Sequence, residues 1–388
     1  MKLRTSKKYM IPGLALAMCV SMPAAAFAEQ SPTFAYSAEE WATLRDNNLD
    51  FNEIDKLIHE YNPTVLKNAI SYSDFIGKTS TDIAESYYDA AEKIYNAMSY
   101  PDEESPAFAS GVTAYLNSEI QYENLREQGD NNTNDQETYR LNYAKEEATL
   151  AKQAKLLMIN YWSSLANLQT YKNNIETAQA NLDQAARKVA AGTATESSRI
   201  TAEQSLTTAQ TALKTAETGI SSTKEELCLM LGWDYGADVN IGALPEVTAE
   251  QVAAIDLAAD IVKAKANNYS LLSTTRQLSN AQTSSVRETL TNTKATSEQN
   301  IASNVADLYT TLNRAVTELN AAEDTLKVQA TNLAAAERKK AAGTMTEKDY
   351  NSAALAYSSA ETAVQVKKYA VLTAYVNYEA AVGGLAAT

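Results

Sequence analysis

The chain has 388 residues and carries 48 acidic against 33 basic side chains, a formal net charge of −15 at pH 7. This negative charge excludes nucleic-acid binding through neutralisation of phosphates, and it argues against docking on anionic lipid headgroups. Glycine and proline together number only 19, and two cysteines cannot form a disulfide framework once one of them leaves with a leader peptide. Such a composition favours long helices.

Residues 1–28 have the pattern of a secretory signal peptide. Four basic residues precede a short apolar run at 10–20, and Ala26-Phe27-Ala28 forms an A-x-A cleavage site. We therefore expect an exported chain that begins at Glu29. We expect no lipidation at Cys19, because the residue before it is methionine rather than a small residue.

The remaining sequence is predicted to form two similar halves, residues 29–231 and 249–388. They are joined by a linker at 232–248 that is dense in turn-forming residues. The first half is longer than the second by about 55 residues, which fall near 98–145. Because this stretch contains two prolines and a run of Asn and Asp, we expect an irregular, partly disordered insertion there.

Apolar residues recur every seven positions in both halves. Such a repeat is typical of helices that stay in contact by supercoiling left-handedly. We therefore expect antiparallel helical arms of about 35–40 residues, roughly 55 Å long at 1.5 Å per residue. The repeat positions are Tyr161, Leu168, Ile175 and Leu182 in the first half, and Leu312, Leu319, Leu326 and Leu333 in the second.

One segment of sixteen residues occurs twice, 151 positions apart. Residues 181–196 and 332–347 are identical at eleven of these positions, and each copy places a glycine where the arm must reverse. Threonines after each glycine suit the start of the next helix. The alternative is one continuous helix through each glycine, at a cost of only about 1 kcal/mol. We predict two hairpin tips, formed by Gly192, Thr193, Glu196, Gly343, Thr344 and Glu347.

No motif in the sequence indicates a catalytic, cofactor-binding or metal-binding site. The chain has one histidine, His59, and it lacks a glycine-rich phosphate loop, a metal-spaced Cys/His set and a nucleophile elbow. We therefore predict a protein that is not an enzyme and that uses no cofactor or metal. The tyrosines between positions 72 and 143 are interpreted as helix-packing residues, with an interface belt as the alternative.

These features resemble the TolC-like outer-membrane factor family, also called outer membrane efflux proteins. The resemblance rests on the paired A-G-T-x-T tips, on glycines 40 residues after them at Gly232 and Gly383, and on an Asn-Pro helix start; it covers about 40–388. It implies an all-α fold of long antiparallel coiled-coil hairpins in two tandem repeats that form a helical barrel. Because residues 283–300 show no alternating strand pattern, we expect little or no membrane β-barrel.

The resemblance also implies a function, with partners and a location. A homotrimer would act as the exit duct of a tripartite efflux or type I export system that conducts small molecules or proteins. The partners would be a periplasmic membrane-fusion adaptor protein at the tips and an inner-membrane ABC or RND-type transporter. The location would be the cell envelope, at the outer membrane. The alternative function is a non-channel coiled-coil envelope scaffold or a surface adhesin.

One acidic residue near the second tip has an implied role of its own. The family's entrance aspartate, six residues past the second glycine, corresponds to Asp349. Three copies of this carboxylate around an axis would form a cation-selective constriction. The alternative is an ordinary solvated helix residue.

Overall fold

The computed structural model describes residues 36–44 and 46–388, so the predicted signal peptide lies outside the described residues. The chain divides into two compact units, Met1–Asp46 and Asn47–Thr388. The described helix of the first unit is α1 (Ala38–Leu44). In the second unit, the predicted halves and the linker pack together rather than as separate compact domains.

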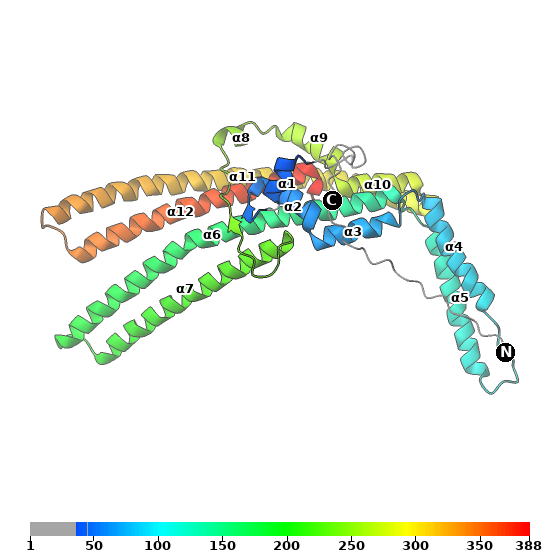
Figure 1. Cartoon of the computed structure of the whole chain (residues 1–388), viewed down its shortest axis with the longest axis horizontal. Coiled ribbons are helices and arrows are strands. Elements are labelled where there is room, and N and C mark those ends of the chain that lie inside the picture. The colour runs from blue at the N-terminus through cyan, green and yellow to red at the C-terminus, as the bar shows by residue number, and fades with distance from the viewer. Residues whose placement is uncertain (1–35, 45) are drawn as a thin grey trace. The chain divides into compact units, whose positions relative to one another are not determined.

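Four long helices form a single layer in the second unit. They are α6 (Gln136–Ala190), α7 (Glu196–Met230), α11 (Ser284–Ala341) and α12 (Glu347–Ala380). Neighbouring helices pack in the order α7–α6–α12–α11, so the layer consists of two antiparallel hairpins side by side, with both tips at the same end (Figure 1). The all-α class with long antiparallel hairpins is therefore confirmed.

The lengths of the four helices differ from the predicted arms in one respect. The returning helices α7 and α12 have 35 and 34 residues, as expected, whereas α6 and α11 have 55 and 58. No proline interrupts either outgoing helix, and each begins at a capping residue, Asp135 or Thr283, whose side chain accepts a backbone hydrogen bond from the first turn. The outgoing helices therefore continue well beyond the ends of their partners.

Shorter helices pack against the extended parts of α6 and α11. Helices α2, α3 and α10 contact α6, and α9 and α10 contact α11. The remaining elements of this unit are β1 (Asn48–Leu49), η2 (Phe51–Glu53), α2 (Ile54–Tyr61), α3 (Pro63–Ser73), α4 (Ser80–Ala97), α5 (Phe108–Asp130), β2 (Asn240–Ile241), α8 (Ala249–Ala253), α9 (Leu257–Asn267), α10 (Tyr269–Asn280) and η3 (Ala381–Leu385).

A buried asparagine stands at the same place in each half of the repeat. Asn62 caps α3 and Asn268 caps α10 through their side-chain oxygens. Their amide groups donate to backbone carbonyls near the end of each half, at 2.8 Å to Met230, the last residue of α7, and at 2.8 Å to Ala386, the residue after η3. Each asparagine thus satisfies two helix termini at once, which explains why the resemblance between the halves includes this position.

The glycine that follows each returning helix differs by one position from the sequence repeat. Gly232 and Gly384 have positive φ, at +88° and +127°, whereas Gly383 does not. The π-helical turn Ala381–Leu385 accommodates one extra residue. At Gly384 a Cβ would lie 2.6 Å from the carbonyl oxygen of Asn267, so the close approach requires glycine there.

The prediction of an irregular insertion near 98–145 was wrong for most of that stretch. Residues 108–130 form α5, which pairs with α4 as a second kind of hairpin, and α6 begins at residue 136. Both prolines lie between α4 and α5, where they interrupt neither helix. The run of Asn and Asp is a hydrogen-bonded turn, because these short side chains bind nearby backbone and side-chain groups.

Candidate functional site

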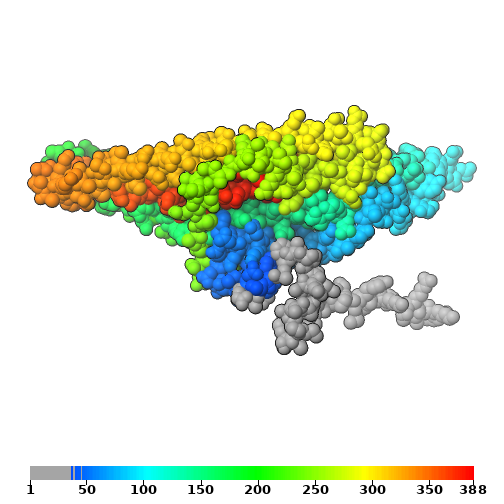
Figure 2. Space-filling view, turned by 90° about the horizontal axis from the view of Figure 1, so that it is seen from above, coloured from blue at the N-terminus to red at the C-terminus, as the bar shows by residue number. Residues whose placement is uncertain are grey.

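The linker between the halves covers one face of the helix layer. Its strand β2 pairs in parallel with β1, and the indole N–H of Trp162 on α6 donates to the carbonyl oxygen of Gly242 at 2.9 Å. Val247 and Val252 pack on Leu312 and Val371, which belong to α11 and α12. Figure 2 shows the yellow-green linker and helices α8 and α9 lying across this face.

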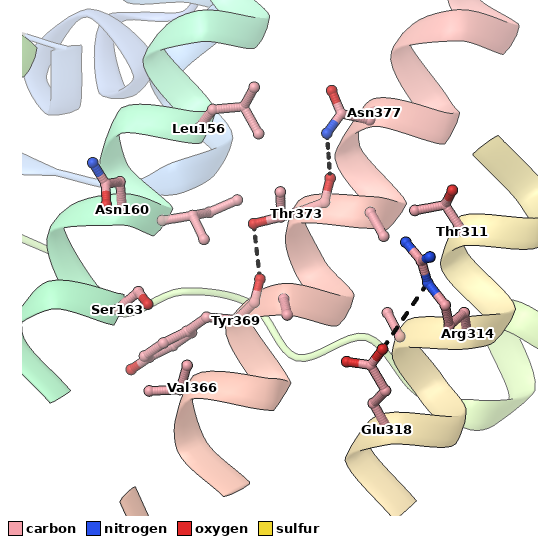
Figure 3. Close-up of a pocket in the computed structure, with 14 residues that line it drawn as sticks. Leu156, Asn160, Ser163, Thr311, Arg314, Glu318, Val366, Tyr369, Thr373 and Asn377 are labelled. Atoms are coloured by element: carbon pink, nitrogen blue, oxygen red, sulfur yellow. Dashed lines mark hydrogen bonds and ion pairs between the residues drawn. The ribbon is translucent and has the colours of Figure 1, made fainter. Parts of the chain in front are cut away.

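A groove runs along α12 on the opposite face of the same layer, between α6 and α11. In Figure 3 the linker ribbon passes behind α12, away from the groove. The residues of α11 agree: the groove uses Arg314 and Glu318, whereas the linker side uses Val316 and Asn320. At 100° per residue these two pairs lie on opposite sides of the helix. The groove has a volume of about 540 Å³.

Aliphatic and uncharged polar side chains line this groove in similar numbers, and many of them are small. Thr373 and Asn377 donate to backbone carbonyls one turn earlier on α12, each at 2.9 Å, as the dashed lines in Figure 3 show. Their polar groups are thereby satisfied within the helix while the side chains still contact the groove. The labelled lining residues are Leu156, Asn160, Ser163, Thr311, Arg314, Glu318, Val366, Tyr369, Thr373 and Asn377.

The charged residues of the groove neutralise one another. Arg314 lies 4.0 Å from Glu318, and the ammonium of Lys367 lies 2.6 Å from the same carboxylate. The hydrogen bond from Lys367 lowers the pKa of Glu318 below its ordinary value. The lining thus carries one charge of each sign, on Arg314 and Glu318, and Lys367 adds a positive charge beside it. The sequence did not predict this groove. The heptad spacing of apolar residues does not show which face of the layer the linker covers, and so it does not show which face stays open.

The first predicted tip is a helix terminus closed by glycine. Gly192 has φ of +68°, and its N–H donates to the carbonyl of Val189 at 2.9 Å. The N–H of Thr193 donates to the carbonyl of Lys188 at 2.9 Å, and its hydroxyl binds the same oxygen at 3.0 Å. These are the bonds of a Schellman motif, in which a left-handed glycine satisfies the last carbonyls of a helix.

The second tip repeats this geometry. Gly343 also has φ of +68°, and Thr344 donates to the carbonyl of Lys339 through its N–H at 2.9 Å and its hydroxyl at 3.1 Å. The next helix then begins at Thr195 in the first tip and at Thr346 in the second, each a side-chain N-cap. Both glycines therefore reverse the chain, and a continuous helix is excluded.

The two predicted tip glutamates have different partners. Glu196 pairs with Arg199 on its own helix at 2.6 Å. Glu347 instead accepts from Lys340, at 2.9 Å, so this pair joins the end of α11 to the start of α12. The Lys340 ammonium also lies 3.8 Å from the centre of the Tyr350 ring. The second tip is thus held across its turn by an ion pair and a cation–π contact.

Asp349 lies exposed in the first turn of α12. Its carboxylate accepts from the Thr346 hydroxyl at 2.7 Å, while Thr346 caps the Asp349 N–H at 3.1 Å. Next to it, the ammonium of Lys348 donates to Gln184 of α6 at 3.1 Å and so joins the two hairpins near their tips. This contact between the hairpins was missed, because no sequence signal pairs residues 164 positions apart.

No helix in the part of the chain that the structure describes is long and apolar enough to cross a bilayer. Within residues 36–44 and 46–388, no group of three or more His, Cys, Asp or Glu side chains is arranged to hold a metal ion.

The arrangement of the helices is similar to that of several solved outer-membrane channels. The CmeC outer membrane channel of Campylobacter jejuni matches with a TM-score of 0.53 at 10% identity, over 97% of this chain and 95% of that one. The channel-forming protein CusC matches with a TM-score of 0.52 at 11% identity, over 91% and 96%. VceC of Vibrio cholerae matches with a TM-score of 0.50 at 12% identity, over 90% and 99%.

These likenesses define the fold of the chain. Neither a protein-family model nor a curated protein matches the sequence. At identities near 10% the structural match reports architecture alone. The chain therefore has the TolC-like outer-membrane factor fold, as the resemblance of its tips and linker predicts.

Proposed function

We propose that this protein is a trimeric exit-duct component of a tripartite efflux or type I export system. It would conduct small molecules or proteins across the cell envelope and lie at the outer membrane. Its partners would be a periplasmic adaptor protein and an inner-membrane ABC or RND-type transporter. It would act as a conduit and not as an enzyme, and the solved structures that it resembles are likewise channels.

This proposal rests mainly on the two unpaired edges of the four-helix layer. Helix α7 packs on α6 alone within the layer, and α11 packs on α12 alone, so both edges lack a long neighbour in the chain. Towards the tips the heptad leucines Leu182, Leu326 and Leu333 are only half-buried. Apolar seams that are half-covered in one chain are completed by other copies in a supercoiled assembly. A closed ring of such layers would enclose a passage.

The difference between the two faces of the layer indicates which face would line the duct. The linker and helices α8 and α9 occupy one face, whereas the groove along α12 is open. A lining of small aliphatic and uncharged polar side chains with one ion pair suits a surface that passes varied solutes without binding them tightly, because a passage needs weak contacts. We therefore assign the groove face to the inside of the duct.

The tips would receive the adaptor protein. Both present the same Schellman turn at the same end of the unit, and the residues at these turns are exposed. A repeated rigid turn gives a partner several equivalent contacts in one assembly, which raises avidity without new chemistry. Gly192, Thr193, Glu196, Gly343, Thr344 and Glu347 would form this contact, with Asp349 at the entrance.

Cross-linking in cells tests the proposal directly. Thr193→Cys and Thr344→Cys each place a thiol at a tip, and Cys228, the natural cysteine of the described chain, is buried. A maleimide that carries a photoreactive benzophenone, attached to either thiol, should link the variant on illumination to one envelope protein, which mass spectrometry would identify as an adaptor. Thr81→Cys, an exposed site on α4 at the other end of the unit, is the control and should not give this product.

The oligomeric state separates the proposal from a coiled-coil scaffold or adhesin. Sedimentation of the mature protein should give three copies per particle. A folded monomer at micromolar concentration, together with no adaptor product from either tip, would reject the duct and favour the scaffold.

A further inference from the structure

The α4–α5 hairpin projects from the end of the unit opposite to the tips (Figure 1). Among the described elements, its helices pack extensively only on each other. Its base is held by polar contacts: Asn132 donates to the carbonyl of Ser80 at 2.8 Å, and Asn280 of α10 donates to the carbonyl of Thr133 at 2.9 Å. The hairpin is therefore a firmly attached element whose outer faces are not used by its own chain.

Three tyrosines line a groove of about 500 Å³ along one side of this hairpin. Tyr95 of α4 is 58% exposed, and its ring centre lies 5.4 Å from that of Tyr122 on α5. Tyr88, two turns earlier on α4, donates its hydroxyl to Asp130 at 2.8 Å. Glu92 adds a second carboxylate to the lining. Aromatic faces and carboxylates thus alternate along the groove.

The chemistry of this groove is electronegative. Between residues 80 and 130 the sequence has eleven acidic and two basic side chains. One of those two, Arg126, lines the groove and places its guanidinium 5.8 Å from the centre of the Tyr122 ring, so the lining carries two negative charges and one positive charge. Aromatic rings attract cations through their negative faces, and carboxylates beside them strengthen this attraction. The groove is therefore complementary to a positively charged group and repels an anionic one.

We infer that this tyrosine groove, formed by Tyr88, Glu92, Tyr95, Tyr122, Arg126 and Asp130, is a docking site for a basic protein segment, which would lie on the side of the groove away from Arg126. Lysine or arginine side chains of the partner would lie against the Tyr88 and Tyr95 rings and pair with Glu92 and Asp130. The high negative charge of the hairpin argues against a second copy of the hairpin as the occupant, because like charges repel. Since the groove lies away from the tips, its partner and an adaptor can bind together.

Peptide binding to the mature full-length protein tests this inference. The probe is a synthetic lysine-rich peptide of about +4 charge, and the reference is the same peptide with acetylated lysines. Tyr95→Ala should weaken binding of the lysine peptide about three- to fivefold, as loss of one exposed cation–π contact predicts. Tyr95→Phe keeps the ring and should bind within about twofold of wild type.

Two charge-matched pairs separate the groove from general attraction. Glu92→Gln with Asp130→Asn removes two charges inside the groove, and Glu103→Gln with Glu104→Gln removes two from the exposed loop between α4 and α5. The groove pair should weaken binding at least several-fold more than the loop pair. Equal losses from both pairs, equal binding of the acetylated peptide, or unchanged binding by Tyr95→Ala would each overturn the inference. Circular dichroism of every variant checks that the hairpin remains helical.

Discussion

The two tip glycines show how a single residue sets the reversal of a long hairpin. Gly343 has a positive φ, and a Cβ placed on it would meet no other atom within 4 Å. Only backbone strain therefore opposes a larger residue there. Because the left-handed conformation costs an L-residue about 1–2 kcal/mol, Gly343→Ala should lower the free energy of unfolding by about that amount.

A second glycine, Gly219, provides a control at which substitution should raise stability rather than lower it. Gly219 lies within α7, has an ordinary helical φ and also has open space around its Cα. Gly219→Ala should therefore raise stability by up to about 1 kcal/mol. Urea unfolding of the two variants measures both effects; equal changes would contradict the assignment of strain to Gly343.

His59 provides a direct test of electrostatics, because it is the single histidine of the chain. Its ring nitrogen lies 2.8 Å from a carboxylate oxygen of Glu147, and this hydrogen bond raises the pKa of His59 above its ordinary value. The pair thus stabilises α2 against α6 fully below the unfolded pKa of about 6.5, and the contribution is lost as pH rises through the folded pKa.

An NMR titration of the one imidazole should show this raised pKa. Glu147→Gln should lower the pKa of His59, and it should flatten the loss of thermal stability between pH 6 and 8. A His59 pKa that is the same in wild type and Glu147→Gln would show that the contact does not form in solution.

Asp349 combines a local role with its proposed role at the entrance. Because its carboxylate accepts from Thr346, truncation to alanine would disturb the helix start as well as remove a charge. Asp349→Asn keeps an acceptor and removes only the charge. If three copies line a constriction, this variant should lower cation over anion selectivity in a reconstituted channel. Identical selectivity in wild type and Asp349→Asn would make Asp349 an ordinary solvated residue of the first helical turn.

At the scale of the elements, a buried carboxylate attaches the α4–α5 hairpin to the rest of its unit. Asp135, at the start of α6, is 2% exposed and accepts from Asn280 at 2.9 Å, Arg276 at 2.5 Å and the Thr138 N–H at 3.0 Å. Burial opposes its ionisation, but the hydrogen bonds and the Arg276 charge hold the pKa of Asp135 below its ordinary value. The turn after α5 is therefore tied to α10.

Loss of this charge should loosen the base of the hairpin. Asp135→Asn should cost about 1.5–3 kcal/mol, the range for hydrogen bonds to a charged group. The effect should be local: amide exchange in α4 and α5 should quicken more than exchange in the tips. Arg276→Ala should show a smaller effect, and the double variant should cost less than the sum of the singles, since the two groups interact. Strict additivity would contradict the pairing.

At the scale of the whole molecule, the two edges of the helix layer are the surfaces that a trimer would join. Ile200 on α7 is 45% exposed and Val328 on α11 is 56% exposed, although both are aliphatic. Ile200→Asp and Val328→Asp should each shift the protein from trimer towards monomer, because a buried unpaired charge is costly. Val262→Asp, on exposed α9, should leave the trimer intact; analytical ultracentrifugation measures all three.

The spacing of residues was sufficient to predict the long hairpins and the position of both tips. Helical periodicity, glycine at a left-handed terminus and threonine N-caps are local properties, and they act over one or two turns. The same locality explains the failure near 98–145, where prolines in a turn between two helices resemble those of an irregular segment. It also explains why the extra residue at Ala381–Leu385 was not visible in the repeat.

Contacts between residues far apart in the sequence were determined only by the tertiary packing of the helices. A heptad position such as Leu319 says which side of a helix is apolar, but only the folded chain shows that this leucine packs on a cluster that includes Val252 of α8 as well as Val371 of α12. The groove along α12, the Lys348–Gln184 contact and the buried Asp135 likewise join residues far apart in sequence. Their energies depend on which surfaces meet, and only the tertiary arrangement of the helices determines that.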